Sequence, residues 1–315
     1  MEYNNGQDFD ESLKMPRRTP DPPTGHGRVP PVPAGARLAR PRYVWRPPPL
    51  VIASLAWHLL VLGALAVSPQ SWPAALLAIL GNHVVLCIPG VYPHSQIFGP
   101  CWRRLPSLGR GDEVALTFDD GPDPEVTPLV LEKLAAAGAR ASFFLIGSRA
   151  EAHPELVERI VAAGHRVENH THHHRYTFAF NLYPFLRREV EKAQRSLGGL
   201  AGRPPAYFRA PAGMHNLFLS AVLARLGLFF VSWTSRGYDT IERDASKVLA
   251  RLTSELQAGD ILLLHDGNAA RTADGQPVVL AVLPPLLDEL ARRRLRAVPL
   301  PEPAGSPLAG KLLWN

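Results

Sequence analysis

The sequence predicts an α/β protein: a distorted (β/α) barrel of about seven strands, preceded by an N-terminal helical hairpin that anchors it to a membrane. Between residues 113 and 301, short apolar runs bounded by turn residues alternate with amphipathic stretches of helical period. Such alternation is typical of a parallel sheet, and this number of units favours a closed or partly closed barrel over an open sheet. Before this region, two uncharged apolar runs follow each other across a short turn.

The apolar runs predict the strands and the amphipathic stretches predict the helices. The expected strands are residues 114–118, 141–146, 165–168, 206–209, 228–233, 261–265 and 295–300. The expected helices are residues 127–137, 154–163, 182–197, 217–226, 245–256 and 278–293.

Composition excludes several classes of protein. The chain of 315 residues has two cysteines, Cys87 and Cys101, so neither a disulfide framework nor a thiolate metal site is supported. The net charge of +6 is uneven, because an arginine run without acidic residues, 28–46, precedes the first apolar run. Basic residues beside a membrane span act as topology signals and contact anionic lipid. No nucleic-acid recognition motif accompanies the charge, so we expect membrane lipid and no nucleic acid as a partner, and no obligate protein partner is evident.

The N-terminal part is expected to hold the chain at a membrane. Residues 1–49 have the Pro-, Gly- and Arg-rich composition of a disordered tail. Residues 50–67 are long enough to cross a bilayer, and a buried core helix is the alternative. A second run, 74–91, carries Asn82 and His83 near its middle, which are costly in lipid unless they face a partner helix or water. This run is therefore a span, a re-entrant piece or an interfacial helix.

These runs give the expected domain organisation and location. Residues 50–91 form one or two transmembrane helices, 92–112 a connector, 113–301 the catalytic domain and 302–315 a C-terminal tail. We expect the bacterial inner membrane as the location. If both runs span, the basic flanks on either side of the pair are cytoplasmic, and so is the catalytic domain. If only the first spans, the catalytic domain is periplasmic.

The first predicted strand ends in Thr-Phe-Asp-Asp-Gly-Pro, residues 117–122. Its two adjacent carboxylates, Asp119 and Asp120, stand at the C-terminal end of a strand, where barrel enzymes place their chemistry. Taken alone, the segment is equally well explained as a turn. As a site, one carboxylate would bind a metal while its neighbour takes a proton.

The third predicted strand ends in a histidine-rich segment in which His170 and His174 stand four apart. On a helix or a tight turn this spacing puts two imidazoles on one side, as neighbouring ligands of a zinc-like ion. Together with one carboxylate they make three protein ligands and leave a position open, which is typical of a catalytic metal site. The alternative is a solvated histidine-rich loop without a metal.

Two further strand ends carry Arg209 and His265. Arg209 precedes a Pro-containing turn and can hold a buried carboxylate ionised and oriented, whereas the alternative is a surface arginine. His265 ends a fully apolar strand and can serve as a proton donor, whereas the alternative is a core histidine.

Four strand ends with these residues in this order resemble the polysaccharide deacetylases of the NodB homology type, carbohydrate esterase family 4. The resemblance covers residues 114–300, and its first motif matches letter for letter. It implies a NodB-type deacetylase barrel that hydrolyses the N-acetyl amide of an amino sugar of the GlcNAc type in a glycan or glycolipid, with metal-bound water as the nucleophile. The implied cofactor is one divalent metal, zinc in the first place, with cobalt, manganese and nickel as alternatives.

The resemblance also implies a role for each catalytic position. Asp119 would be the general base, Arg209 would hold it in place, and His265 would be the catalytic acid. The implied metal ligands are Asp120, His170 and His174.

The walls of the site are where the sequence departs from the family. Ala212 stands where Tyr is usual, although its backbone N–H would still serve the oxyanion hole, and Leu263 would face the acetyl methyl group. Trp233 and Asp239 are the nearest candidates for the fourth motif. Arg175 stands where the second motif usually has Pro. These departures put the substrate more in doubt than the reaction.

Two other functions compete with N-deacetylation. The first is the same chemistry on another acyl group or carrier, such as deformylation or deacylation of a lipid-linked sugar, which the membrane anchor and the altered wall favour. The second is a carbohydrate-binding pseudoenzyme, which has no need for a base, three metal ligands and an acid together.

Overall fold

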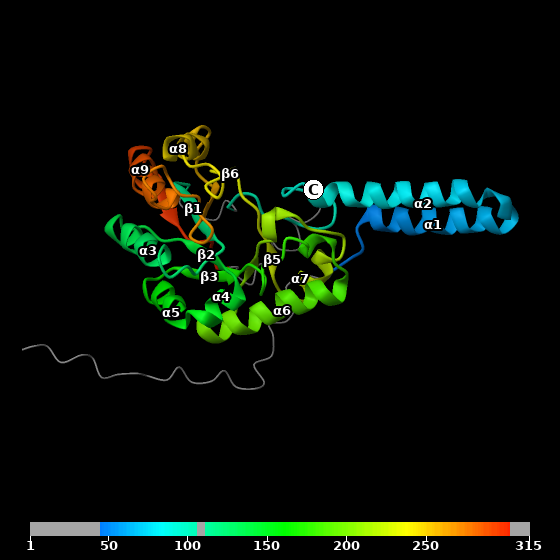
Figure 1. Cartoon of the computed structure of the whole chain (residues 1–315), viewed down its shortest axis with the longest axis horizontal. Coiled ribbons are helices and arrows are strands. Elements are labelled where there is room, and N and C mark those ends of the chain that lie inside the picture. Colours follow the sequence, from blue (N-terminus) through cyan, green and yellow to red (C-terminus); the bar gives the residue numbers. More distant parts are fainter. Residues whose placement is uncertain (1–44, 106–110, 303–315) are drawn as a thin grey trace, which may run out of the picture. The chain divides into compact units, whose positions relative to one another are not determined.

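The computed structural model describes residues 45–105 and 111–302 (Figure 1). The expected N-terminal tail lies outside these residues except for its last five positions, and the expected C-terminal tail lies outside them except for Glu302.

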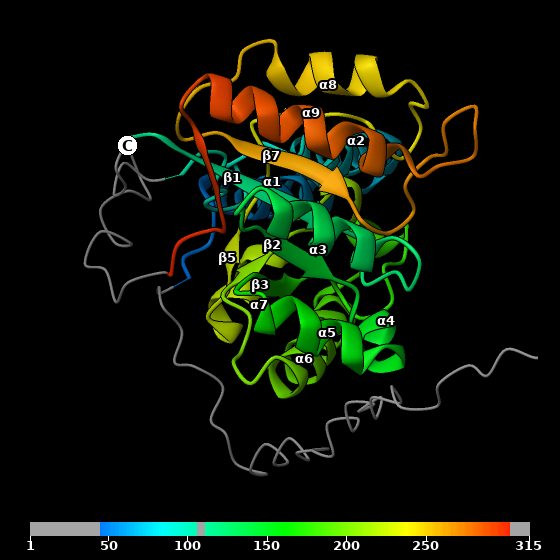
Figure 2. The same cartoon turned by 90° about the vertical axis from the view of Figure 1, so that its left-hand side faces the viewer.

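The described residues of the catalytic region form one parallel sheet in the strand order β5-β4-β3-β2-β1-β7-β6, with β8 also paired to β1. The sheet curves into a half-barrel, which confirms the predicted fold class (Figure 2). The strands are β1 Glu113–Asp119, β2 Ser142–Leu145, β3 Arg166–Asn169, β4 Tyr207–Phe208, β5 Phe229–Phe230, β6 Ser235–Arg236, β7 Ile261–His265 and β8 Arg296–Val298.

Helices cover the outer face of this sheet, where α3, α5 and α9 lie in front of it in Figure 2. All six predicted helices are present, with ends within three residues of the prediction. The short helix α4 and the two-residue strand β6 were not predicted, because neither is long enough to show a hydrophobic period. The helices are α3 Thr127–Ala136, α4 Gly147–Ala152, α5 Pro154–Ala162, α6 Tyr183–Leu200, α7 Leu219–Leu226, α8 Ala245–Thr253 and α9 Val278–Arg292.

Alternation along β1 decides which side chains face the inside of the half-barrel. Leu116 and Phe118 belong to the core beneath the helices, whereas Ala115 belongs to the core inside the curved sheet. Successive side chains of a strand point to opposite faces, so Asp119 points inward like Ala115. His265 is the partner of Asp119 on β7 and points the same way. The carboxyl ends of the strands thus gather polar side chains above an apolar interior.

The predicted strand 228–233 is longer than β5 because its second half pairs elsewhere. The Trp102 N–H donates to the Phe230 carbonyl at 2.9 Å, and the Ser232 N–H donates to the Trp102 carbonyl at 2.8 Å. Trp102 thereby forms a parallel bridge with Val231. The segment expected as a plain connector therefore contributes backbone pairing to the edge of the half-barrel.

The first two helices, α1 Pro49–Val67 and α2 Trp72–Cys87, lie side by side as a hairpin, joined by a short 3-10 turn (Figure 1). Asn82 does not face away from the hairpin: its Nδ2 donates to Ser54 Oγ at 2.7 Å. The rings of His58 and His83 meet edge to face at 5.3 Å. Polar groups of one helix thus find partners on the other, which removes most of their cost in lipid.

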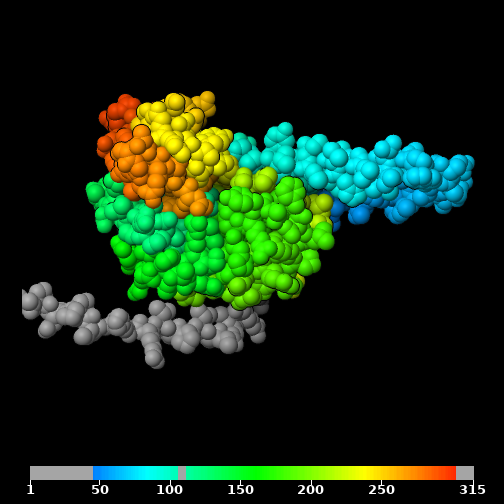
Figure 3. Space-filling model, viewed as in Figure 1, coloured from blue at the N-terminus to red at the C-terminus, as the bar shows by residue number. Residues whose placement is uncertain are grey.

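Many large apolar side chains of the hairpin are exposed, among them Leu59, Leu60 and Leu77. In the view of Figure 3 no other coloured part of the chain covers most of the hairpin. Both segments are long and apolar enough to cross a membrane, with mean hydropathies of 2.3 for Pro49–Val67 and 2.0 for Pro69–Val91. Only 11% and 17% of their apolar windows are buried, so a buried core helix does not fit. This length and composition suit a membrane anchor or a signal sequence.

Candidate active site

The backbone after β1 turns both carboxylates toward one cavity. Asp120 has a φ of 71°, in the left-handed region that Asp tolerates better than most residues. Gly121 has no room for a side chain, because a Cβ there would lie 2.2 Å from Asp266 Oδ2. The turn residues and the carboxylate pair are therefore parts of one arrangement, with both carboxylates almost fully buried.

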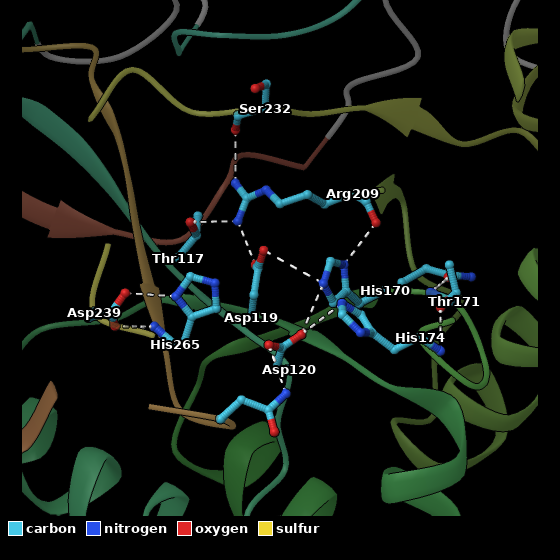
Figure 4. A network of polar contacts seen from close by, with 12 residues as sticks. Thr117, Asp119, Asp120, His170, Thr171, His174, Arg209, Ser232, Asp239 and His265 are labelled. Carbon is cyan, nitrogen blue, oxygen red and sulfur yellow. Dashed lines mark hydrogen bonds and ion pairs between the residues drawn. The ribbon is translucent and has the colours of Figure 1, made fainter. Parts of the chain in front are cut away.

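Arg209, directly after β4, is completely buried and holds Asp119 (Figure 4). Its Nη1 donates to Asp119 Oδ1 at 2.6 Å and to Thr117 Oγ1 at 2.9 Å. Its Nη2 donates to the Ser232 carbonyl at 2.9 Å, and its Cζ lies 4.1 Å from the centre of the Phe144 ring. With the guanidinium fixed on several sides, Asp119 has one oxygen held and the other directed into the cavity.

Asp120, His170 and His174 bring three donor atoms within 4.8 Å of one another. Asp120 Oδ1 lies 3.0 Å from His174 Nε2 and 3.3 Å from His170 Nε2. Four ligands at zinc-bond lengths stand about 3.3 Å apart, so these spacings suit a shared ion. The Oδ1 atom is buried and accepts no hydrogen bond from any described residue, which is what a carboxylate oxygen aimed at a cation would show. This donor set fits a divalent metal.

The surroundings keep these ligands in their metal-binding forms. Burial by itself would raise the pKa of Asp120, but His170, His174 and His265 lower it below its usual range. Burial, followed by the charge of His170, lowers the pKa of His174 to about 4. His170 Nδ1 donates to the Arg209 carbonyl at 2.8 Å, which leaves its Nε2 free to bind a metal.

The histidine pair lies on a tight turn and not on a helix. Thr171 and His174 have φ values of 65° and 51°. The His174 N–H donates to Thr171 Oγ1 at 3.0 Å, and this bond closes the turn. The Thr171 hydroxyl therefore helps to bring the imidazoles of His170 and His174 together. A solvated histidine-rich loop without a defined turn would not form this hydrogen bond.

His265, at the end of β7, is held from behind by Asp239 (Figure 4). Asp239 accepts from His265 Nδ1 at 2.8 Å and from the His265 N–H at 2.7 Å. Burial by itself would lower the pKa of His265, but the charge and hydrogen bond of Asp239, together with Asp119 and Asp120, raise it to about 8. These contacts favour the protonated form of the ring near neutral pH, and the ring lines the cavity.

A cavity of about 310 Å³ joins these groups. Three of the four residues predicted for substrate or oxyanion contacts, Ala212, Leu263 and Trp233, line it. Ala212 has a φ of 53°, and its N–H donates to no described backbone carbonyl. Asp239, expected near the substrate, is instead fully buried behind His265, so its position suits orientation of the imidazole and not contact with substrate.

Two residues near Asp120 were missed by sequence reasoning. Arg149 Nη1 donates to the Asp120 carbonyl at 2.7 Å, and its Nη2 donates to Asn268 Oδ1 at 2.9 Å. Asn268 Nδ2 in turn donates to Asp120 Oδ2 at 3.0 Å. Both follow the ends of predicted strands, so the rule that found the other site residues could have drawn attention to them. Together they fix the oxygen of Asp120 that does not face the imidazoles.

Comparisons with known proteins show which family the chain is similar to. The family profile described as polysaccharide deacetylase matches residues 109–231. The chain is 32% identical over 191 residues to a peptidoglycan-N-acetylglucosamine deacetylase of Bacillus cereus, covering 60% of this chain and 86% of the relative. It is 33% identical over 204 residues to a chitooligosaccharide deacetylase of Bradyrhizobium sp., covering 60% and 89%.

Solved structures give the same assignment. A family 4 carbohydrate esterase from Streptomyces lividans, in complex with acetate, superposes with a TM-score of 0.54 at 31% identity over 60% of this chain and 92% of that one. Members of this family hydrolyse amide carbon–nitrogen bonds of N-acetylated sugars. The chain belongs to the polysaccharide deacetylase family of NodB type, carbohydrate esterase family 4, and is a hydrolase of carbon–nitrogen bonds other than peptide bonds.

Proposed function

We propose that the chain removes the N-acetyl group from GlcNAc-type residues of a glycan or glycolipid in a metal-dependent hydrolysis. The observation that carries the proposal is that one cavity contains three metal-binding donor atoms, a carboxylate that is not one of them, and a histidine whose Nδ1 is held by a buried carboxylate. The relatives named above act on peptidoglycan or chitooligosaccharide, so an N-acetylated glycan is the first substrate class to test.

Asp119 is the proposed base. A divalent cation bound by Asp120, His170 and His174 would polarise the amide carbonyl and acidify a water molecule. Asp119 takes a proton from the attacking water as the oxygen–carbon bond forms, because Arg209 holds its Oδ1 while its Oδ2 faces the metal-binding cluster, 3.8 Å from His170 Nε2. Zinc is the first candidate for the cation, and cobalt, manganese and nickel are alternatives.

His265 and the backbone complete the reaction. As the carbon–nitrogen bond breaks, His265 gives its Nε2 proton to the leaving amine, and acetate and the free amino sugar are the products. The Ala212 N–H donates to the negatively charged oxygen, and loss of one such donor typically costs about 3 kcal/mol. Leu263 faces the methyl group of the acetyl moiety from the cavity wall.

The test of this function is the Asp119→Asn variant. Acetate release from N-acetylated chitooligosaccharides and peptidoglycan fragments should fall to background, while zinc bound per chain, measured by atomic absorption, stays close to wild type. Asp274→Asn is the control, because this exposed carboxylate lies in a loop and accepts a hydrogen bond from the neighbouring Thr272 hydroxyl. Turnover retained by Asp119→Asn would refute the base assignment. A wild-type chain that binds no metal and hydrolyses no substrate would instead support a carbohydrate-binding pseudoenzyme.

A second candidate is deformylation or deacylation of a lipid-linked sugar. The apolar, exposed surface of the α1–α2 hairpin favours it, because an anchored enzyme meets lipid-linked substrates in the membrane plane. Acetate and formate release from matched lipid-linked and polymeric substrates distinguishes the two candidates.

We further propose that α1 and α2 anchor the catalytic domain, residues 113–301, to the bacterial inner membrane. Support comes from the paired polar groups Asn82 and Ser54 within the hairpin. Protease access to the domain in intact spheroplasts tests its sidedness. Digestion would place the domain in the periplasm with exported glycans, and protection would place it in the cytoplasm with lipid-linked precursors.

A further inference from the structure

Arg236, on β6, points into the proposed catalytic cavity. Its Cα is the register partner of Leu263 on β7. Residues in register on neighbouring parallel strands point to the same face of the sheet, and Leu263 shares its face with His265. Both Arg236 and Leu263 line the cavity that contains the metal-binding cluster. The guanidinium is therefore placed beside the wall that would receive the acyl group.

Aromatic rings hold this guanidinium in place. Its Cζ lies 5.0 Å from the ring centre of Tyr238 and 5.4 Å from that of Trp233. Guanidinium groups stack on aromatic faces and keep their N–H donors directed outward. Arg236 is thus oriented without using any of its hydrogen-bond donors.

Arg236 also lacks a partner of opposite charge. Its Nε is buried without a hydrogen-bond partner, and no carboxylate of a described residue forms an ion pair with it. Nearby arginines differ: Arg209 is paired with Asp119, and Arg251, whose Cζ lies 5.8 Å from the centre of the Tyr238 ring, is paired with Glu242. A partly buried, oriented and unpaired guanidinium in a ligand cavity suits a planar or tetrahedral anion, which it can bind through two parallel hydrogen bonds.

We propose that Arg236 binds an acidic group, a carboxylate or a phosphate, carried by the substrate next to the N-acetyl group that is hydrolysed. This inference rests on the proposed function and names a substrate class within it. A carboxylate would belong to an acidic sugar of a polymer, and a phosphate to the linkage of a lipid-linked sugar. A carboxylate and a phosphate can each present two oxygen atoms to the guanidinium. The structure therefore does not distinguish the acidic sugar from the lipid-linked sugar, and an experiment is needed to do so.

The test compares matched pairs of probes on the full chain in detergent. The carboxylate pair is an N-acetylated amino-sugar oligosaccharide bearing a lactyl ether and its methyl ester. The phosphate pair is N-acetylglucosamine 1-phosphate and methyl N-acetylglucosaminide. The wild-type chain should favour the acidic member of one pair by about 10- to 100-fold in kcat/KM, the range expected for a charge-assisted hydrogen-bond pair. The pair that shows the preference identifies the source of the anion.

Variants assign the preference to Arg236. Arg236→Gln should lose it, Arg236→Lys should keep part of it, and the control Arg251→Gln should keep all of it, because Arg251 makes the same change in charge outside the cavity. Thermal unfolding of each variant verifies folding. A wild-type chain without preference for either acidic member, or a preference that survives Arg236→Gln, would overturn the proposal.

A binding measurement keeps this inference separate from the proposed function. Isothermal titration calorimetry measures the affinity of each probe for the Asp119→Asn variant, with and without Arg236→Gln. Because Asp119→Asn should not turn over substrate, the difference in affinity between the acidic and the neutral probe reports recognition of the acidic group alone. Absence of turnover by the wild-type chain would count against the proposed function. Equal binding of the acidic and neutral members would count against the role of Arg236.

Discussion

Replacing Asp239 with asparagine isolates the charge behind His265. The carboxylate accepts two hydrogen bonds from this residue, one from Nδ1 and one from the backbone N–H. Asparagine is nearly the same size but has one oxygen and no charge. The variant therefore keeps the packing of this fully buried position while it removes the interaction that favours the imidazolium.

The expected size of the effect follows from the pKa of His265. Asp239 and its neighbours raise this pKa from 6.5 to about 8, and a difference of 1.5 units corresponds to about 2 kcal/mol. Without the Asp239 charge, burial dominates and the pKa falls to its ordinary value or below. At pH 7.5 the protonated fraction then drops from about three quarters to about a tenth or less. We expect kcat/KM to fall at least about eightfold at pH 7.5 and far less at pH 6.

The assay is the pH profile of kcat/KM for an N-acetylated chitooligosaccharide. If His265 is the acid, the alkaline limb moves to lower pH by about 1.5 units in Asp239→Asn. A bound cation would lower the limb of both proteins alike, so the difference between them is the quantity to measure. Asp260→Asn is the control, because this buried carboxylate precedes β7 at the end opposite to His265 and pairs with Arg104. An unchanged alkaline limb in a folded, metal-loaded Asp239→Asn protein would refute the acid assignment.

The raised pKa of His265 should also make the free energy of unfolding depend on pH. The pKa of His265 is raised in the folded state, so its contribution is fully present below pH 6.5 and is lost as the pH rises through about 8. The difference in unfolding free energy between wild type and Asp239→Asn should therefore be larger at pH 6 than at pH 9. Urea unfolding at the two values measures it.

Three further predictions concern the groups around the carboxylates. Arg209→Leu should lower the unfolding free energy by about 3–5 kcal/mol in urea unfolding, because it leaves a buried carboxylate unpaired, and adding Asp119→Asn should restore part of the loss. Asn268→Ala and Arg149→Gln should each weaken zinc binding about 10- to 100-fold, because Asn268 and Arg149 orient Asp120. Competition with a chelator measures the affinity, and an unchanged affinity would contradict this role. Removing the metal with a chelator should abolish acetate release, and zinc or cobalt should restore it.

Much of the site could be predicted because its residues stand at the ends of apolar strands. β1 and β7 are buried and mostly apolar, and parallel strands bring their carboxyl ends to one edge. Once Asp119 and His265 are each placed at a strand end, the register between the two strands makes them neighbours. The sequence predicts that Arg209 holds a buried carboxylate, but only the family resemblance names Asp119 as its partner. The contact between Asp239 and His265 was not predicted. Partners 90 and 26 residues apart in the chain leave no local pattern.

Other features were beyond sequence reasoning for physical reasons. β6 has two residues, so it has no period from which a strand or the direction of Arg236 could be predicted. Arg149 lies on the short helix α4 and Asn268 lies in the segment after β7, and their common contact with Asp120 exists only once these two segments meet. Residues 92–112 were expected only as a connector, but Trp102 completes the backbone pairing of an edge that the predicted strand could not satisfy alone.

The segment around Asp119 and Asp120 could be interpreted from the sequence as a turn or as a catalytic site. In the structure the same residues form the turn and line the site. A left-handed Asp120 brings its carboxylate to the same cavity as that of its neighbour, although adjacent strand residues point apart. Gly121 must lack a side chain because Asp266 lies where a Cβ would be. Asp266 is held by the Thr127 hydroxyl, and burial raises its pKa to about 7. Replacing Gly121 would therefore displace the carboxylates themselves, so the turn residues are as necessary to the chemistry as the groups that perform it.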